Sequence, residues 1–163
     1  MNLEGFMMKQ VELNEYLDNS PTEEQLVAAI TAELGEFMNS IKYGEYGWSW
    51  WPRPENKGSS RDEALGEYID ILHFLLVGYE RYNKGALAYH QVMVNEYLDA
   101  PPPSFQEALY DHPFIILKNA RERRYHLAIM GWLAMGKVFG FDEKQIDEGF
   151  ARSVEKNLGR WTA

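Results

Sequence analysis

The apolar residues of this chain recur every three or four positions over most of its length. The clearest stretch follows Pro21, where large apolar residues stand at helical spacing: Leu26, Ile30, Leu34, Phe37 and Ile41. Such spacing predicts amphipathic α-helices that each bury one face. Convincing segments of alternating apolar and polar residues, which would predict half-buried strands, do not occur in the sequence. The expected fold class is therefore all-α, a multi-helix bundle.

Capping and breaking residues divide the chain into its expected helices. Ser-x-x-Glu patterns that predict capping boxes begin at Ser20, Ser60 and Ser104, and Gly159 predicts a helix end. The expected helices are 3–18, 21–43, 61–82, 86–99, a long helix over 113–136 and a last helix over 143–158. With 163 residues, the chain is expected to form one domain, residues 1–163.

The composition excludes several classes of site and partner. There is no cysteine, which excludes disulfides, thiolate zinc sites, iron–sulfur clusters and cysteine nucleophiles. With 25 acidic and 16 basic side chains the net charge is −9, which argues against binding to nucleic acid. The first ten residues do not resemble a secretory signal, and the longest apolar run, 68–79, is too short to cross a bilayer. A cytoplasmic protein without a nucleic-acid or membrane partner is expected.

One pair of carboxylates is predicted to lie close to the buried face of a helix. On a helical wheel with Leu26 at zero, Glu33 falls at about −20°, among the apolar residues, and Glu36 lies about 60° further round. A buried carboxylate is costly unless it is paired or bound to a metal. Alternatively, Glu33 is an acid at the edge of the helix, paired with a lysine or arginine.

A second pair lies in the most apolar helix. Within residues 67–79, Glu67 and Asp70 stand on the side away from the large aliphatic residues, together with Phe74. If the two helices pack side by side, four carboxylates converge, and their repulsion favours a bound cation. Oxygen ligands suit Mg²⁺, which commonly carries substrate phosphates. The two pairs together favour a metal cluster over surface acids.

The remaining motifs are consistent with a nucleotide. Trp48, Trp50 and Trp51 lie in a long loop where they could stack on a base, although they could equally anchor the loop in the core. Basic residues that could meet phosphates are of two kinds. Those near the loop are Lys42, Arg53 and Lys57, and those on the last helix are Arg152, Lys156 and Arg160. A basic stripe of this kind is also compatible with a solvated face.

These motifs, taken in order, resemble the dimeric all-α dUTP diphosphatases, within the wider MazG-like nucleoside triphosphate pyrophosphohydrolases. The matching segments are Gln10 to Asn14, Glu33-Leu34-Gly35-Glu36, the tryptophan loop, Glu67 to Phe74, and Lys156-Asn157 followed by Arg160. Residues 83–150 contribute no match. The family often has a lysine where Ser49 stands, so Lys42, Arg53 or Lys57 would have to supply that charge.

The resemblance implies a reaction and the residues that perform it. Glu33, Glu36, Glu67 and Asp70 would bind two or three Mg²⁺ ions, and Glu36 would orient or deprotonate the water that attacks the triphosphate. The enzyme would hydrolyse dUTP to dUMP and pyrophosphate and would work as a homodimer.

The resemblance also implies how the nucleotide is held. Gln10 and Asn14 would read the base edge, and a tryptophan of the loop, Trp48 or Trp51, would pack on the base. Phe74 would lie under the sugar. The phosphates would be held by Lys156, Asn157 and Arg160.

Three alternatives remain open from the sequence. The first is a related pyrophosphohydrolase that acts on dCTP or another, modified deoxynucleoside triphosphate. The second is a di-iron bundle, since Asp70 and His73 imitate one Glu-x-x-His motif, but no second copy exists. The third is a non-catalytic helical interaction module. His73 itself is interpreted as a histidine that supports the site or the core and is not a metal ligand.

Overall fold

The structure is a computed structural model that describes residues 1–16, 20–42 and 60–161. These residues form seven α-helices and no strand, which confirms the all-α class. The helices are α1 (Leu3–Asn14), α2 (Glu23–Ser40), α3 (Arg61–Tyr82), α4 (Leu87–Asp99), α5 (His112–Arg121), α6 (Tyr125–Val138) and α7 (Glu143–Trp161). A short 3₁₀ helix, Lys84–Ala86, leads into α4, and a π-helical turn, Glu107–Asp111, leads into α5.

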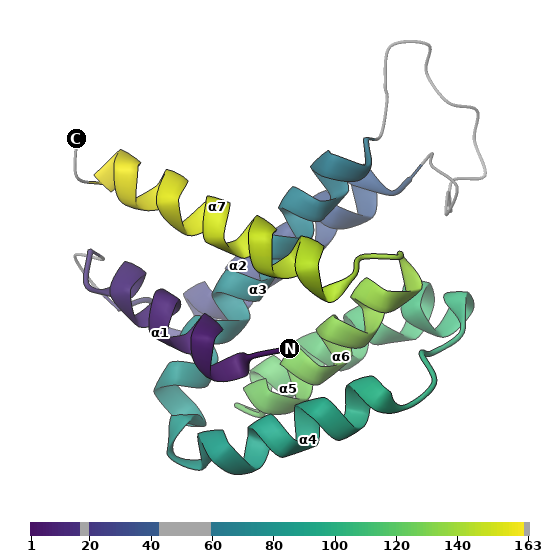
Figure 1. The fold of residues 1–163 in the computed structure, drawn as a ribbon, viewed down its shortest axis with the longest axis horizontal. Coiled ribbons are helices and arrows are strands. Elements are labelled where there is room, and N and C mark those ends of the chain that lie inside the picture. Colours follow the sequence, from purple (N-terminus) through teal and green to yellow (C-terminus); the bar gives the residue numbers. More distant parts are fainter. Residues whose placement is uncertain (17–19, 43–59, 162–163) are drawn as a thin grey trace.

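Helix α3 is the element around which the bundle is built. It contacts α1, α2, α6 and α7. In Figure 1 it runs diagonally through the molecule, α7 crosses it, and α1 lies on the side away from α5 and α6. Because α3 is apolar around most of its circumference, with eleven buried residues, it can face four neighbours at once.

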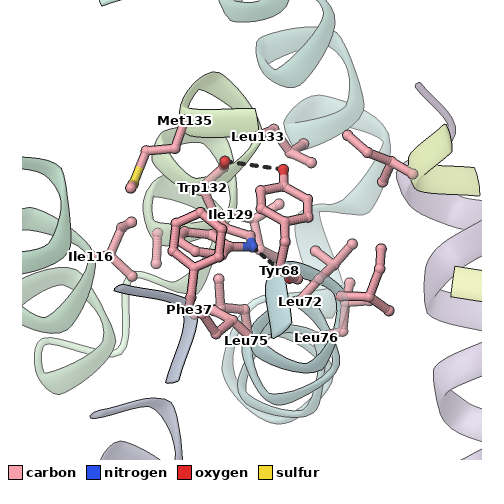
Figure 2. Close-up of a cluster of buried hydrophobic side chains, with 14 of the residues drawn as sticks. Phe37, Tyr68, Leu72, Leu75, Leu76, Ile116, Ile129, Trp132, Leu133 and Met135 are labelled. Atoms are coloured by element: carbon pink, nitrogen blue, oxygen red, sulfur yellow. Dashed lines mark hydrogen bonds between the residues drawn. The ribbon is translucent and has the colours of Figure 1, made fainter. Parts of the chain in front are cut away.

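The core joins α3 firmly to α6. The Tyr68 hydroxyl donates to the Trp132 carbonyl over 3.1 Å, and the Trp132 indole N–H donates to the Tyr68 carbonyl over 2.9 Å (Figure 2). Their rings stack with centroids 4.7 Å apart, and the ring of Phe37 from α2 meets Trp132 edge-on at 5.1 Å. Both polar groups are therefore satisfied in a fully buried site, as buried tyrosine and tryptophan require.

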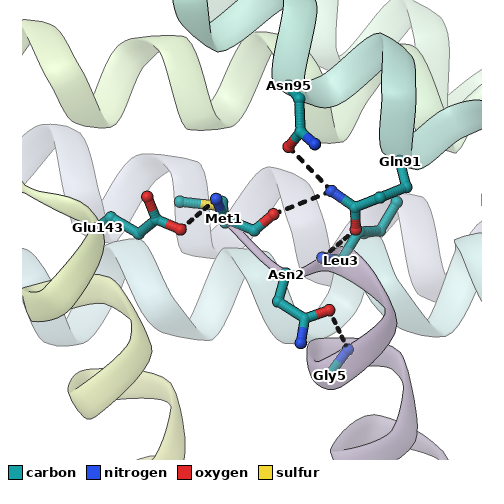
Figure 3. A network of polar contacts seen from close by, with 7 residues as sticks. All are labelled: Met1, Asn2, Leu3, Gly5, Gln91, Asn95 and Glu143. Carbon is teal, nitrogen blue, oxygen red and sulfur yellow. Dashed lines mark hydrogen bonds and ion pairs between the residues drawn. The ribbon is translucent and has the colours of Figure 1, made fainter.

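A polar network holds α1 against α4 and α7. The Gln91 side chain accepts from the Leu3 amide over 2.7 Å and donates to the Met1 carbonyl over 2.9 Å (Figure 3). The Met1 amino group pairs with Glu143 at the start of α7. These contacts fix the start of α1, so that its later residues, Gln10 among them, lie along α3.

The start of α2 differs from the prediction. Thr22, not Ser20, is the N-cap: its hydroxyl accepts from the Gln25 amide over 3.2 Å, and the Gln25 side chain accepts from the Thr22 amide over 2.8 Å. The capping box is thus shifted by two residues. The predicted boxes at Ser60 and Ser104 do cap their helical turns, with Glu63 and Glu107 amides as donors.

The predicted long helix over 113–136 is wrong, because the chain turns at Glu122–Arg124 and forms α5 and α6. Arg123 adopts a left-handed conformation with φ of 60°, and the Arg124 amide donates to the Asn119 carbonyl over 2.8 Å, closing the end of α5. Three other ends also differ: α1 stops at Asn14, short of residue 18, α2 stops at Ser40, short of residue 43, and α7 continues through Gly159 to Trp161.

Candidate active site

Three of the four predicted acids meet where α2 packs on α3. Glu33 comes from α2, and Glu67 and Asp70 come from α3, one turn apart. One carboxylate oxygen of each lies within 4.8 Å of the others. All three side chains are half-buried. We call these three residues the acid triad.

Glu36 lies one turn further along α2 and is exposed. It does not belong to the acid triad, but its negative charge contributes to the raised pKa of Glu33, Glu67 and Asp70. It therefore stands close to the acid triad, on the side that solvent can reach.

The acid triad carries more negative charge than its surroundings neutralise. Burial, and then the charges of Glu36, Asp70 and Glu67, raise the pKa of Glu33 to about 7. Burial followed by repulsion from Glu36 and Asp70 likewise raises the pKa of Glu67. Crowded carboxylates with raised pKa values favour the binding of a cation, because a cation offsets their mutual repulsion.

The acid triad suits a divalent cation. Its donors are carboxylate oxygens, which hard cations such as Mg²⁺ prefer. The described residues that could group around a metal include no histidine, and His73 is engaged elsewhere, which speaks against the di-iron alternative. The residues present therefore fit the hard metal that the sequence predicts.

The raised pKa values predict how pH affects stability without metal. Because the pKa of Glu33 is about 7 in the folded protein and 4.5 ordinarily, the folded state binds more protons between these values, and stability falls as pH rises through this window. We expect the melting temperature in EDTA to fall from pH 5 to pH 8, and Mg²⁺ at pH 8 to restore it. Differential scanning fluorimetry measures both effects.

Monovalent salt at the same ionic strength is the control for simple screening of charge. A melting temperature at pH 8 that responds equally to NaCl and to MgCl₂ would contradict a specific cation site at the acid triad.

A pocket of about 470 Å³ opens between α3 and α7 beside the acid triad. Asp70 lines it from α3, and Arg152 and Lys156 line it from α7. The other lining residues are Asp62, Leu65, Gly66, Ile69, Gly149 and Ser153. Acidic groups therefore meet basic groups across one cavity, an arrangement suited to an anion that arrives with a metal.

One face of α7 carries the predicted phosphate contacts. Lys156, Asn157 and Arg160 share this face at helical spacing, with Lys156 and Arg160 exposed and Asn157 half-buried. Burial raises the pKa of Asp70, while the positive charges of Lys156 and Arg160 act to lower it. These two cations are thus close enough to the acid triad to act on the same substrate group.

The predicted base-reading residues lie on α1 and are tied to α3. The Gln10 amide nitrogen donates to the Asn14 side-chain oxygen over 2.9 Å, and the Gln10 oxygen lies 2.7 Å from His73 Nδ1. His73 Nε2 lies 3.0 Å from the Ser153 hydroxyl of α7. His73 is buried, which lowers its pKa to about 4, and both its nitrogens are engaged by protein groups, as expected of a histidine that is not a metal ligand.

Ser153 is a site residue that the sequence did not predict. Ser153 stands three positions before Lys156 and therefore shares its face of the helix, which is the one signal the sequence offers for it. No spacing rule relates a serine to a histidine 80 positions away. Phe74 is half-buried on α3 and packs against the core. Trp48 and Trp51, together with Ser49, Arg53 and Lys57, lie outside the described residues.

A protein-family model described as dUTPase matches residues 2–163. The chain belongs to the dUTPase family. The resemblance seen in the motifs is thereby confirmed, and with it the class of enzyme, a nucleoside triphosphate diphosphatase that acts in nucleotide metabolism. This dUTPase has no match among curated proteins or among solved structures.

Family membership has two further consequences for the site. dUTPases generally depend on a divalent metal, and the acid triad is the group of described residues that could hold one. Their substrate is a nucleotide. No helix within the described ranges is long and apolar enough to cross a membrane.

Proposed function

We propose that this dUTPase hydrolyses dUTP to dUMP and pyrophosphate in a Mg²⁺-dependent reaction. One observation carries the proposal: three carboxylates from α2 and α3 converge within 4.8 Å, beside a pocket that also holds basic side chains, in a chain of the dUTPase family. Bound by Glu33, Glu36, Glu67 and Asp70, two or three Mg²⁺ ions would neutralise the phosphates and supply an acidified water.

The protein groups around this centre have separate tasks. Glu36, which is exposed next to the acid triad, orients the attacking water and accepts its proton. Lys156, Asn157 and Arg160 hold phosphate oxygens, and the positive charges of Lys156 and Arg160 offset the charge on the pyrophosphate that leaves. Charge-assisted hydrogen bonds of this kind are stronger than neutral ones.

The nucleoside end is assigned to α1 and α3. Gln10 and Asn14 read the edge of the base, and Phe74 of α3 lies under the deoxyribose. Trp48 or Trp51 packs on the base. These base-reading roles are carried over from the family resemblance.

We propose further that the enzyme works as a homodimer. Large apolar side chains that α4 and the segment 110–115 leave exposed support this: Tyr89, Val92, Tyr97, Tyr110, Phe114 and Ile115. Large apolar side chains left exposed commonly take part in interfaces between proteins. Light scattering of the purified protein measures the oligomeric state, and a monomeric mass would contradict the proposal.

The test of the function is a substrate panel of dUTP, dCTP, dTTP and UTP, each assayed for pyrophosphate release in MgCl₂ and in EDTA. We expect dUTP to be hydrolysed fastest and only with Mg²⁺. A preference for dCTP would show that the proposed substrate is wrong and would leave the proposed reaction class unchanged. No pyrophosphate from any triphosphate would reject the proposed reaction.

A further inference from the structure

A line of four polar side chains crosses the molecule from α7 to α1. Ser153 contacts His73 Nε2 at 3.0 Å, His73 Nδ1 contacts the Gln10 oxygen at 2.7 Å, and the Gln10 nitrogen contacts the Asn14 oxygen at 2.9 Å. The two central members are deeply buried, with His73 8% and Gln10 4% exposed. We call this line the Ser153–Asn14 relay.

The relay has a defined direction of donation. The Gln10 oxygen can only accept, so His73 Nδ1 carries the proton and donates to it. A neutral imidazole then has Nε2 free of hydrogen, so Nε2 accepts from the Ser153 hydroxyl. Gln10 in turn donates from its amide nitrogen to the Asn14 oxygen. The amide nitrogen of Asn14, at the half-buried end of the relay, takes no part in the relay and is the donor that Asn14 would offer to the base it is proposed to read.

An amide side chain reads a base by its orientation. Uracil and thymine carry a carbonyl acceptor at position 4, where cytosine carries an amino donor. An Asn14 amide held with its nitrogen toward the site matches the carbonyl and opposes the amino group. If the amides of Gln10 and Asn14 both rotated by half a turn, the same residues would match cytosine instead.

We propose that His73 is a positioning residue for base selection: held by Ser153, it fixes the amide orientation of Gln10 and Asn14 and so makes the site select a carbonyl over an amino group at position 4 of the pyrimidine. The inference rests on the proposed role of α1 in reading the base. It adds the residues that determine which base the same amides accept.

The competing role for His73 is packing alone. Its ring stacks on Phe150 with centroids 4.3 Å apart, and a phenylalanine would keep that contact. The substitution His73→Phe therefore separates the two roles, because it removes both ring nitrogens and retains an aromatic ring.

The experiment compares kcat/KM for dUTP, dCTP and dTTP in the wild-type enzyme and in His73→Phe. We expect the ratio of dUTP to dCTP to fall about tenfold or more, the scale of one well-placed base contact, mainly through KM. The ratio of dUTP to dTTP should stay within about twofold, because both bases present the same edge to the amides.

Two further variants keep the test independent of folding. Ser153→Ala removes one hydroxyl that is only half-buried, and it should lower the dUTP to dCTP ratio in the same direction by a smaller factor. In Gln10→Glu both side-chain oxygens can only accept hydrogen bonds. The Asn14 amide should therefore turn so that its nitrogen donates to this carboxylate and its oxygen faces the base, which should move the preference toward dCTP. The matched control is His112→Phe, because His112 is a buried histidine whose contact, the Glu107 carbonyl, lies outside the relay. This variant should leave the ratio unchanged.

The possible failures are distinguishable. A wild-type enzyme that prefers dCTP overturns the proposed substrate and this inference together. A wild-type preference for dUTP that survives both His73→Phe and Ser153→Ala overturns this inference alone. An equal loss for all three substrates in these variants also overturns it, since a structural role alone would have that effect.

Discussion

Replacement of Asp70 by asparagine is expected to lower kcat/KM for dUTP by about 10³-fold or more without unfolding the protein. Asp70 supplies one oxygen to the acid triad and also lines the pocket between α3 and α7. Loss of groups that merely support a metal ligand already costs about 10- to 100-fold, so loss of a ligand costs more. Pyrophosphate release at saturating Mg²⁺ measures the effect.

The same substitution should leave the melting temperature of the metal-free protein unchanged or raise it. Burial and the nearby Glu36 raise the pKa of Asp70, which means that its charge is held at a cost, and asparagine has nearly the same shape without that charge. The matched control is Glu80→Gln on the same helix, where the acid pairs with Lys84. It should retain activity within about twofold. An Asp70→Asn enzyme with wild-type activity would show that the metal lies elsewhere.

Replacement of Gly78 by alanine is expected to destabilise the fold by about 3 kcal/mol, the upper end for an overpacked core. A Cβ atom at Gly78 would lie 2.1 Å from the Tyr125 ring. That ring cannot yield easily, because it stacks on Tyr82 with centroids 5.8 Å apart and the Tyr125 amide donates to Asn83 over 2.9 Å. Urea denaturation followed by circular dichroism measures the loss.

Gly159→Ala is the control for the helix propensity of alanine. Gly159 is also helical, but a Cβ atom there would have no neighbour within 4 Å, so the change should stabilise α7 by up to about 1 kcal/mol. Equal stability of the two variants would contradict the close packing of α3 against the start of α6.

The helices were predictable from the sequence, and one boundary between them was not. The segment from Arg121 to Arg124 contains neither glycine nor proline, so nothing local predicts the turn that separates α5 from α6. The turn is supported by contacts that only the fold brings about. Arg123 pairs with Glu23 at 2.6 Å and lies 5.1 Å from the ring centre of Tyr82.

The start of α2 shows a different limit. Residues 20–25 contain two overlapping capping boxes, one from Ser20 and one from Thr22, and both satisfy the same local rule. In the structure the box from Thr22 forms. Glu23 is thereby left free to pair with Arg123, a contact across 100 positions that no local rule contains.

The candidate site divides in the same way. Helical periodicity alone placed Glu33 beside the buried face of α2, and it grouped Glu67 with Asp70 on α3. That α2 and α3 lie side by side is a tertiary fact, as is the contact of Ser153 with His73. The roles of Gln10 and Asn14 came from the family resemblance, since a glutamine and an asparagine carry no signal of their own.

The paired bonds between Tyr68 and Trp132 bear on how the enzyme can respond to a nucleotide. Tyr68 immediately follows Glu67, and its hydroxyl and carbonyl are both bonded to Trp132 of α6. A slide or rotation of α3 would break two buried bonds at once, each costly to leave unmade. Helix α3 thus behaves as a fixed frame for its two acids. Any movement that accompanies nucleotide binding is therefore expected in the elements that flank α3.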